Sequence, residues 1–167
     1  MKKLILWLLV LGLLFGCSGC GSADPTEKAA QKAAEYILKT AEPAPGSEWA
    51  AFTLAVRGDA GASAWMDEYL SAMEEYVSEN NGLPGMLKVT DYARTVLALT
   101  AAGEDASAFA GVDLTLPLQD EELVRSQGVA AVSFALLALD SGGYAEDINN
   151  YYVNIQSTEE AFWSENK

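Results

Sequence analysis

The residues that offer the most chemistry stand at the starts of two apolar stretches. Glu48 and Trp49 open one stretch, Asp91 and Tyr92 open another at near-equivalent positions, and Arg94 follows one turn later. Two carboxylates a few ångströms apart could share a proton or cleave a glycosidic bond. Acidic residues in the first turn of a helix also stabilise it by about 0.3–1 kcal/mol without any function. An arginine on an apolar helix needs an acidic partner. We therefore assign no catalytic residue and treat these five side chains as candidates for lining a ligand site.

The amino-acid composition argues against a metal site, a cofactor and a nucleic-acid partner. The 167 residues contain no histidine, and Cys17 and Cys20 are the two cysteines. The commonest general base and zinc ligand is thus missing, so we expect no metal and no cofactor. The formal net charge of −14 repels phosphate backbones, so nucleic acid is not an expected partner.

The first residues have the features of an export signal. Lys2 and Lys3 precede a short apolar run, which ends in Leu14-Phe15-Gly16-Cys17. As a helix this run rises about 20 Å, less than the ~30 Å core of a membrane. A basic start followed by a short apolar run fits a signal peptide over residues 1–16. Its end resembles the lipobox of bacterial lipoproteins, which implies lipidation of Cys17 and an anchor on the extracellular face of a bacterial membrane. Cys20 is a second candidate, and a secreted protein or an uncleaved anchor is the alternative.

A small-residue tether, 17–23, precedes the body of the protein at 24–167. The body contains three similar apolar stretches, each closed by a turn: Glu48–Asp59, Thr90–Gly103 and Gly128–Gly142. Placing Leu54, Leu97 and Leu137 in register gives periods of 43 and 40 residues. A period of roughly 40 residues is typical of helical-hairpin repeats. The register predicts that these three leucines are buried at equivalent contacts.

Half-polar stretches alternate with the apolar ones. We expect the half-polar helices outside and the apolar helices buried on most sides. The expected helices span Asp24–Thr40, Ser47–Arg57, Ala62–Glu79, Thr90–Ala102, Gln119–Ser126, Gly128–Ser141 and Ala145–Ile155. Gly111–Pro117 is expected to be an extended connection.

Five short segments carry a resemblance to a known superfamily. They are Ser47-Glu48-Trp49-Ala50, Glu79-Asn80-Asn81-Gly82, Asp91-Tyr92-Ala93-Arg94, Ala138-Leu139-Asp140-Ser141-Gly142 and Gln156–Trp163. Over Asp24–Trp163 the chain is similar to the prenyltransferase/squalene-cyclase α/α toroids, and in particular to bacterial cell-surface members. Ala161 stands where that group usually has a glycine. The resemblance implies an all-α fold, with helical hairpins arranged in a partial toroid of about half a ring.

The half-ring has a consequence for partners. It would leave a large apolar face open at its end, which monomeric soluble proteins rarely do. The resemblance therefore implies that a protein partner, or further repeats missing from this sequence, closes the ring. We expect the isolated chain to be marginally stable and to self-associate.

The catalytic motifs of the superfamily are missing here. The chain lacks an Asp-x-Asp-Asp string, lacks a zinc set of Asp, Cys and His, and lacks a thioester cysteine beside glutamine. Three functions remain open. The first is a non-catalytic, lipid-anchored surface protein for binding or display. The second is a binding module for uptake of a small molecule, as in the cobalamin carriers of this fold. The third is an enzyme acting on glycans or isoprenoids.

Overall fold

A computed structural model describes residues 24–145 of the chain. These residues form seven α-helices and one short 3-10 helix, and this part of the chain contains no strand. The helices are α2 (Pro25–Thr40), α3 (Glu48–Arg57), η1 (Ala60–Ala62), α4 (Ser63–Asn80), α5 (Val89–Ala102), α6 (Leu116–Gln119), α7 (Glu121–Ser126) and α8 (Val129–Gly142). The all-α class is therefore confirmed. The leader, Cys17, the tether and the segment after Ala145 lie outside the described residues.

The chain divides into two compact units, residues 1–36 and residues 37–167. The described part of the first unit is the greater part of α2. Its start follows the sequence signal closely, because Asp24 Oδ1 accepts a hydrogen bond of 3.0 Å from Thr26 N and proline occupies the first helical position. The predicted bounds of this helix are confirmed.

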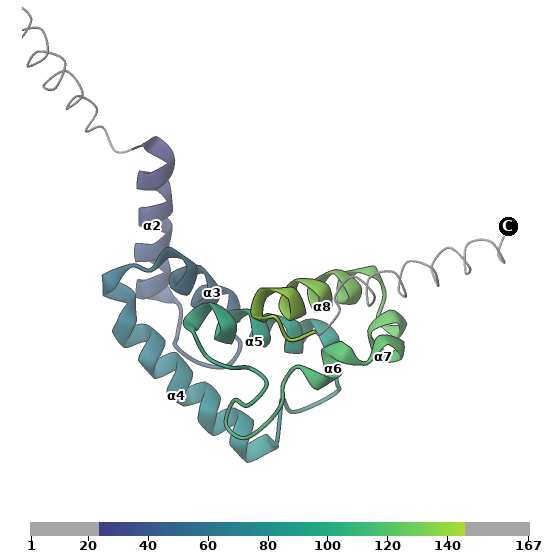
Figure 1. Cartoon of the computed structure of the whole chain (residues 1–167). Helices are drawn as coiled ribbons and strands as arrows, with labels where there is room; N and C mark the ends of the chain where they lie inside the picture. Colours follow the sequence, from purple (N-terminus) through teal and green to yellow (C-terminus); the bar gives the residue numbers. More distant parts are fainter. Residues whose placement is uncertain (1–23, 146–167) are drawn as a thin grey trace, which may run out of the picture. The chain divides into compact units, whose positions relative to one another are not determined.

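The three repeat helices form the centre of the second unit. α5 lies between α3 and α8 and packs against both of them (Figure 1). The last turns of α3 and α5 line one surface hollow together, and the ends of α5 and α8 line another. The C-terminal ends of the three helices thus lie together, so the helices run in the same direction.

The glycines that end these helices establish their register. Gly58, Gly103 and Gly143 are each the C-cap and each adopt a left-handed conformation, with φ of 66°, 91° and 64°. This is the usual end of an α-helix, because glycine has no side chain to clash there. Aligning the helices on these glycines makes Leu54, Leu99 and Leu139 equivalent, each four residues before its glycine. All three leucines are fully buried.

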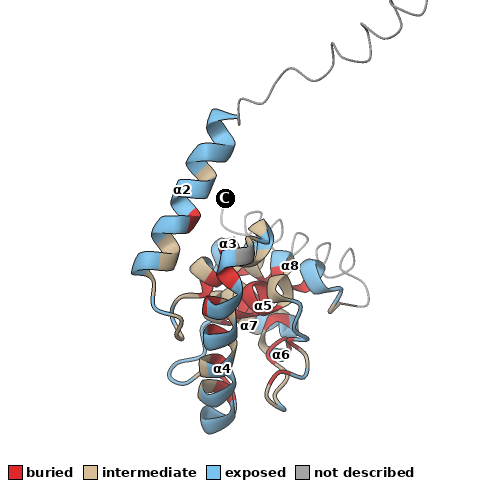
Figure 2. Ribbon diagram, turned by 90° about the vertical axis from the view of Figure 1, so that its left-hand side faces the viewer, coloured by how far each residue is buried: buried red, intermediate tan, exposed pale blue. Residues whose placement is uncertain are grey.

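The predicted register of Leu54, Leu97 and Leu137 is therefore wrong. Leu54 and Leu97 are buried, but the Leu137 side chain is 58% exposed. Leucines two residues apart in α5 and α8 allow either alignment, and the sequence comparison chose the pair that does not share the cap. The prediction that each apolar helix is buried on most sides holds for α5 and fails for α3 and α8. Among the described helices, α8 has α5 beside it and no equivalent neighbour on the opposite side (Figure 2).

The half-polar helix α4 packs against α3 and buries one stripe of side chains. The stripe repeats every four residues and consists of Trp65, Tyr69, Met73 and Val77. Glu68 and Glu75, on the other side of α4, are exposed, as is Lys32 of α2. Their exposure agrees with the expectation that the half-polar helices turn charged side chains to solvent.

The connection from α5 to α8 contains a loop and two short helices. The expected helix over Gln119–Ser126 is divided between α6 and α7, and α7 starts at an Asp120 cap whose Oδ1 accepts from Leu123 N at 3.0 Å. Both short helices pack against α8, and α6 also contacts α5. The loop before α6 contains an isolated antiparallel bridge between Phe109 and Val112. This connection supplies the outer cover of α5 and α8.

Candidate functional site

An aromatic face crosses the repeat helices near their first turns. The Trp49 and Phe134 rings lie 5.9 Å apart, although one belongs to α3 and the other to α8. Phe52 meets Trp49 edge-on with ring centroids 6.1 Å apart. Trp49, Arg94 and Phe134 each stand nine residues before their capping glycine, so the same level of each helix supplies one large side chain. We call Trp49, Phe52, Arg94 and Phe134 the aromatic face.

The aromatic face is open to solvent. Trp49 is 44% exposed, while Phe52, Arg94 and Phe134 are half-buried. A tryptophan that is well exposed and already held by two other rings is a pre-ordered contact surface. The face can hold an apolar or ring-shaped group without first ordering its own side chains.

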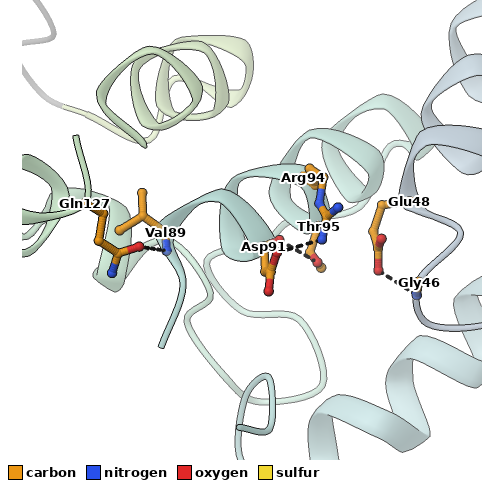
Figure 3. A network of polar contacts seen from close by, with 7 residues as sticks. All are labelled: Gly46, Glu48, Val89, Asp91, Arg94, Thr95 and Gln127. Atoms are coloured by element: carbon orange, nitrogen blue, oxygen red, sulfur yellow. Dashed lines mark hydrogen bonds and ion pairs between the residues drawn. The ribbon is translucent and has the colours of Figure 1, made fainter. Parts of the chain in front are cut away.

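A charged pair lies at the start of α5. Arg94 Nη2 contacts Asp91 Oδ1 at 2.7 Å, and the two side chains are 34% and 41% exposed. Thr95 adds a bond of 3.1 Å from its hydroxyl to the Asp91 carbonyl oxygen. The Nε atom of Arg94 is buried and has no hydrogen-bond partner. Figure 3 shows the three side chains together on the first turns of α5. Because an exposed pair adds only about 0–1 kcal/mol to stability, its main effect is to hold the guanidinium in one orientation.

Glu48 is in a different environment from Asp91. Its side chain is buried, and its Oε1 accepts a 2.8 Å hydrogen bond from Gly46 N, just before α3 (Figure 3). A carboxylate at this position satisfies a free amide and interacts favourably with the helix dipole. Counting from the glycine caps makes Glu48 equivalent to Ala93, not to Asp91. The structure therefore does not place the two carboxylates at equivalent positions.

Tyr69 was not singled out from the sequence, but its hydroxyl is a buried polar group without a hydrogen-bond partner. The ring stacks on Trp65 at 5.6 Å, the residue is fully buried, and its Oη has no hydrogen-bond partner. Burial raises the pKa of the Tyr69 hydroxyl well above its usual range, and the negative charge of Glu48 raises it further. The hydroxyl therefore stays protonated at neutral pH. Its regular position within a four-residue stripe made it indistinguishable from an ordinary core residue.

Tyr92 supports a loop and does not join the aromatic face. Its buried ring places Oη where it accepts a 3.2 Å hydrogen bond from Leu83 N. The same oxygen lies 3.0 Å from the position that a side-chain carbon on Gly82 would occupy. Tyr92 thus fixes the turn between α4 and α5, and Gly82 provides the space for it.

Two further polar side chains connect consecutive repeats over long distances in sequence. Gln127, just before α8, accepts from Val89 N at 2.9 Å and donates to the Leu87 carbonyl oxygen at 3.0 Å. It thereby caps α5 from outside that helix, as Figure 3 shows. Tyr144, just after α8, accepts from Ala106 N at 3.0 Å, and its hydroxyl lies 3.1 Å from the Thr100 hydroxyl. Neither contact has a local sequence signal, because each joins residues about 40 positions apart.

The hollows of the surface are shallow. The one between the ends of α3 and α5 has a volume of about 320 Å³ and is lined mainly by small side chains, among them Ala55, Ala62 and Ala101. Within residues 24–145 no three His, Cys, Asp or Glu side chains are grouped as metal ligands. None of the described helices is long and apolar enough to cross a membrane.

No family model matches this sequence. No curated protein and no solved structure matches it either. The site is therefore interpreted from its own geometry. Of the five candidate residues, the structure places Trp49 and Arg94 on the aromatic face, pairs Asp91 with Arg94, and gives Glu48 and Tyr92 contacts that support local backbone. Cys17, the candidate for lipidation, lies outside the described residues.

Proposed function

We propose that this protein is a non-catalytic binding or display protein of the bacterial surface. In this proposal a lipid on Cys17 holds it at the extracellular face of the membrane, and the repeat helices form part of an α/α toroid. The aromatic face then contacts a ligand or a protein partner. The observation that carries the proposal is the Trp49–Phe134 contact, which joins two repeats at a solvent-exposed surface.

The polar groups around the face support recognition over catalysis. Asp91 and Arg94 neutralise each other, and Glu48 is occupied by the Gly46 amide. A general acid or base needs a proton that it can exchange with a substrate within hydrogen-bond reach. A paired arginine at the same helix level as two aromatic side chains is instead typical of surfaces that orient a bound partner.

A small molecule is the alternative ligand. The exposed indole of Trp49, with hydrogen-bonding groups one helix away, would suit a flat ring system such as a cobalamin-like compound. Binding of such a compound would quench the fluorescence of the wild-type protein more than that of Trp49→Leu. If the natural ligand is a protein instead, the added compound should quench the wild-type protein and Trp49→Leu to the same extent.

The anchor and the surface are tested separately on cells that express the full chain. Radiolabelled palmitate should enter the wild-type protein and Cys20→Ser, and it should not enter Cys17→Ser. Equal labelling of all three proteins, or of none, contradicts the lipid anchor.

For the surface, a benzophenone amino acid is placed at position 49 and, as a matched control, at the exposed position 75 on α4. We expect a photo-crosslinked adduct from position 49 alone. Adducts of equal yield from both positions, or from neither, contradict the binding role of the aromatic face.

A further inference from the structure

The contact between α5 and α8 shows how one repeat receives the next. Val89 is tied through its amide to Gln127, just before α8, and Thr100 is tied through its hydroxyl to Tyr144, just after α8. Val89 and Thr100 are three turns apart on one side of α5, with Ala93 and Val96 between them. This stripe of α5 therefore faces α8, and Val89, Ala93 and Val96 are fully buried.

The buried side of α8 consists of three alanines and Leu139. Ala131, Ala135 and Ala138 are spaced by four and three residues, so they share one side of the helix, and all three are fully buried. Side chains as small as alanine allow two helices to approach closely. Because α5 is the main neighbour of α8, the contact sets an apolar stripe of one helix against a largely alanine side of the next.

The stripe of α5 that faces α8 has a counterpart on α8, and most of its side chains are exposed to solvent. Counting from the capping glycines, Val129, Ser133 and Leu136 are equivalent to Val89, Ala93 and Val96, and Leu137 is equivalent to Leu97. Leu97 is 8% exposed, whereas Leu137 is 58% exposed and Val129 is 67% exposed. We call Val129, Ser133, Leu136 and Leu137 the α8 edge.

We propose that the α8 edge is a docking site for one further α-helix, which presents three small residues at positions i, i+4 and i+7 and runs parallel to α8. The argument is the continuity of the interface: α8 itself is a helix of this kind, and it occupies the equivalent edge of α5. Asp140, which is exposed and equivalent to Thr100, would accept a hydrogen bond from the end of the incoming helix, as Tyr144 serves Thr100. The α8 edge shares no residue with the aromatic face, and the inference does not depend on the proposed function.

The probe for the test is a peptide that copies residues 128–143, since α8 is the natural occupant of such an edge. Lysines added at both ends keep it soluble, and a fluorophore reports binding by anisotropy. The protein is the full chain held in phospholipid nanodiscs. A control peptide has aspartate in place of the alanines at 131, 135 and 138.

We expect saturable binding of the α8 peptide and none of the control peptide. Leu137→Asp should weaken binding at least tenfold, because it places a charge in the middle of the edge. Val56→Asp changes a similarly exposed apolar side chain on α3 and should leave binding unchanged. Both substituted positions are exposed, so neither change is expected to unfold the protein.

Three results would overturn the proposal. One is the absence of saturable peptide binding, or an equal loss in Leu137→Asp and Val56→Asp. Another is a wild-type chain that sediments as a dimer and becomes monomeric in Leu137→Asp, because a second copy would then occupy the edge. A third is tighter peptide binding after the double change Phe162→Asp and Trp163→Asp, which would show that the chain's own last residues cover the edge.

Discussion

Helices α5 and α8 are alike in sequence and differ in surroundings. Each has 14 residues, ends at a left-handed glycine, and places a leucine four residues before that glycine. α5 has a neighbour on both sides and buries eight of its residues, whereas α8 has one such neighbour and buries four. The apolar character of a helix thus indicates that it needs cover, but the position of the helix in the array determines how much cover it receives.

The largest expected effect comes from truncating two leucines that stand at the same distance from the capping glycines of α5 and α8. Leu97→Ala in α5 should lower the free energy of unfolding by about 2–5 kcal/mol, because the side chain is buried and leaves a cavity. Leu137→Ala in α8 should change it by less than about 0.5 kcal/mol, the range of exposed positions. Urea unfolding followed by circular dichroism gives both values. Equal losses would mean that α8 is as well covered as α5.

A second test addresses how α5 is closed at its first turn. Gln127→Ala removes two hydrogen bonds that join α5 to the residues before α8, so we expect a loss of about 1–2 kcal/mol. Gln119→Ala is the matched control, since its side chain bonds to Thr115 within the same short segment. A loss no greater than that of the control would show that water caps α5 equally well.

Much of the fold was predictable because its signals are local. The starts and ends of α2, α3, α4, α5 and α8 lie within one residue of the expected bounds, since proline, asparagine and glycine mark them in the sequence. The register was not predictable from the leucines, because Leu97 and Leu99 in α5, like Leu137 and Leu139 in α8, give two alignments of equal quality. The capping glycines distinguish the two alignments, since each one fixes a backbone conformation.

The candidate site was predictable in part. Trp49 and Arg94 stood out as large side chains at helix starts, and Asp91 was a foreseeable partner of Arg94. The Gln127 cap and the unpartnered Tyr69 hydroxyl depend on packing between elements that are far apart in sequence. No periodicity reports such contacts, so only the structure reveals them.

The smallest expected effect concerns the other flank of the array, where α4 packs against α3. Tyr69→Phe removes a buried hydroxyl that has no partner, so stability at neutral pH should stay within about 1 kcal/mol of wild type, on the more stable side. The pKa of Tyr69 is raised in the folded state, so its contribution is complete below the ordinary tyrosine pKa of about 10 and declines as pH rises above it.

The urea midpoint should therefore fall between pH 9 and pH 11 in the wild type and fall less in Tyr69→Phe. Tyr76→Phe, a half-buried tyrosine on the same helix, is the control. The same fall in all three proteins would show that Tyr69 does not titrate differently from an exposed phenol.

The Gln127 cap also has a meaning for the order of events during synthesis. The first amide of α5 at Val89 receives its acceptor from a residue that is made 38 positions later. At a translation rate of roughly 5–20 residues per second, this interval lasts about 2–8 s. During that time α3 and α5 are both present, but α5 has neither its cap nor the cover of α8. A nascent chain paused between these two points would expose a helix that buries eight of its 14 residues in the folded protein, and this is the interval in which a chaperone would have the most to bind.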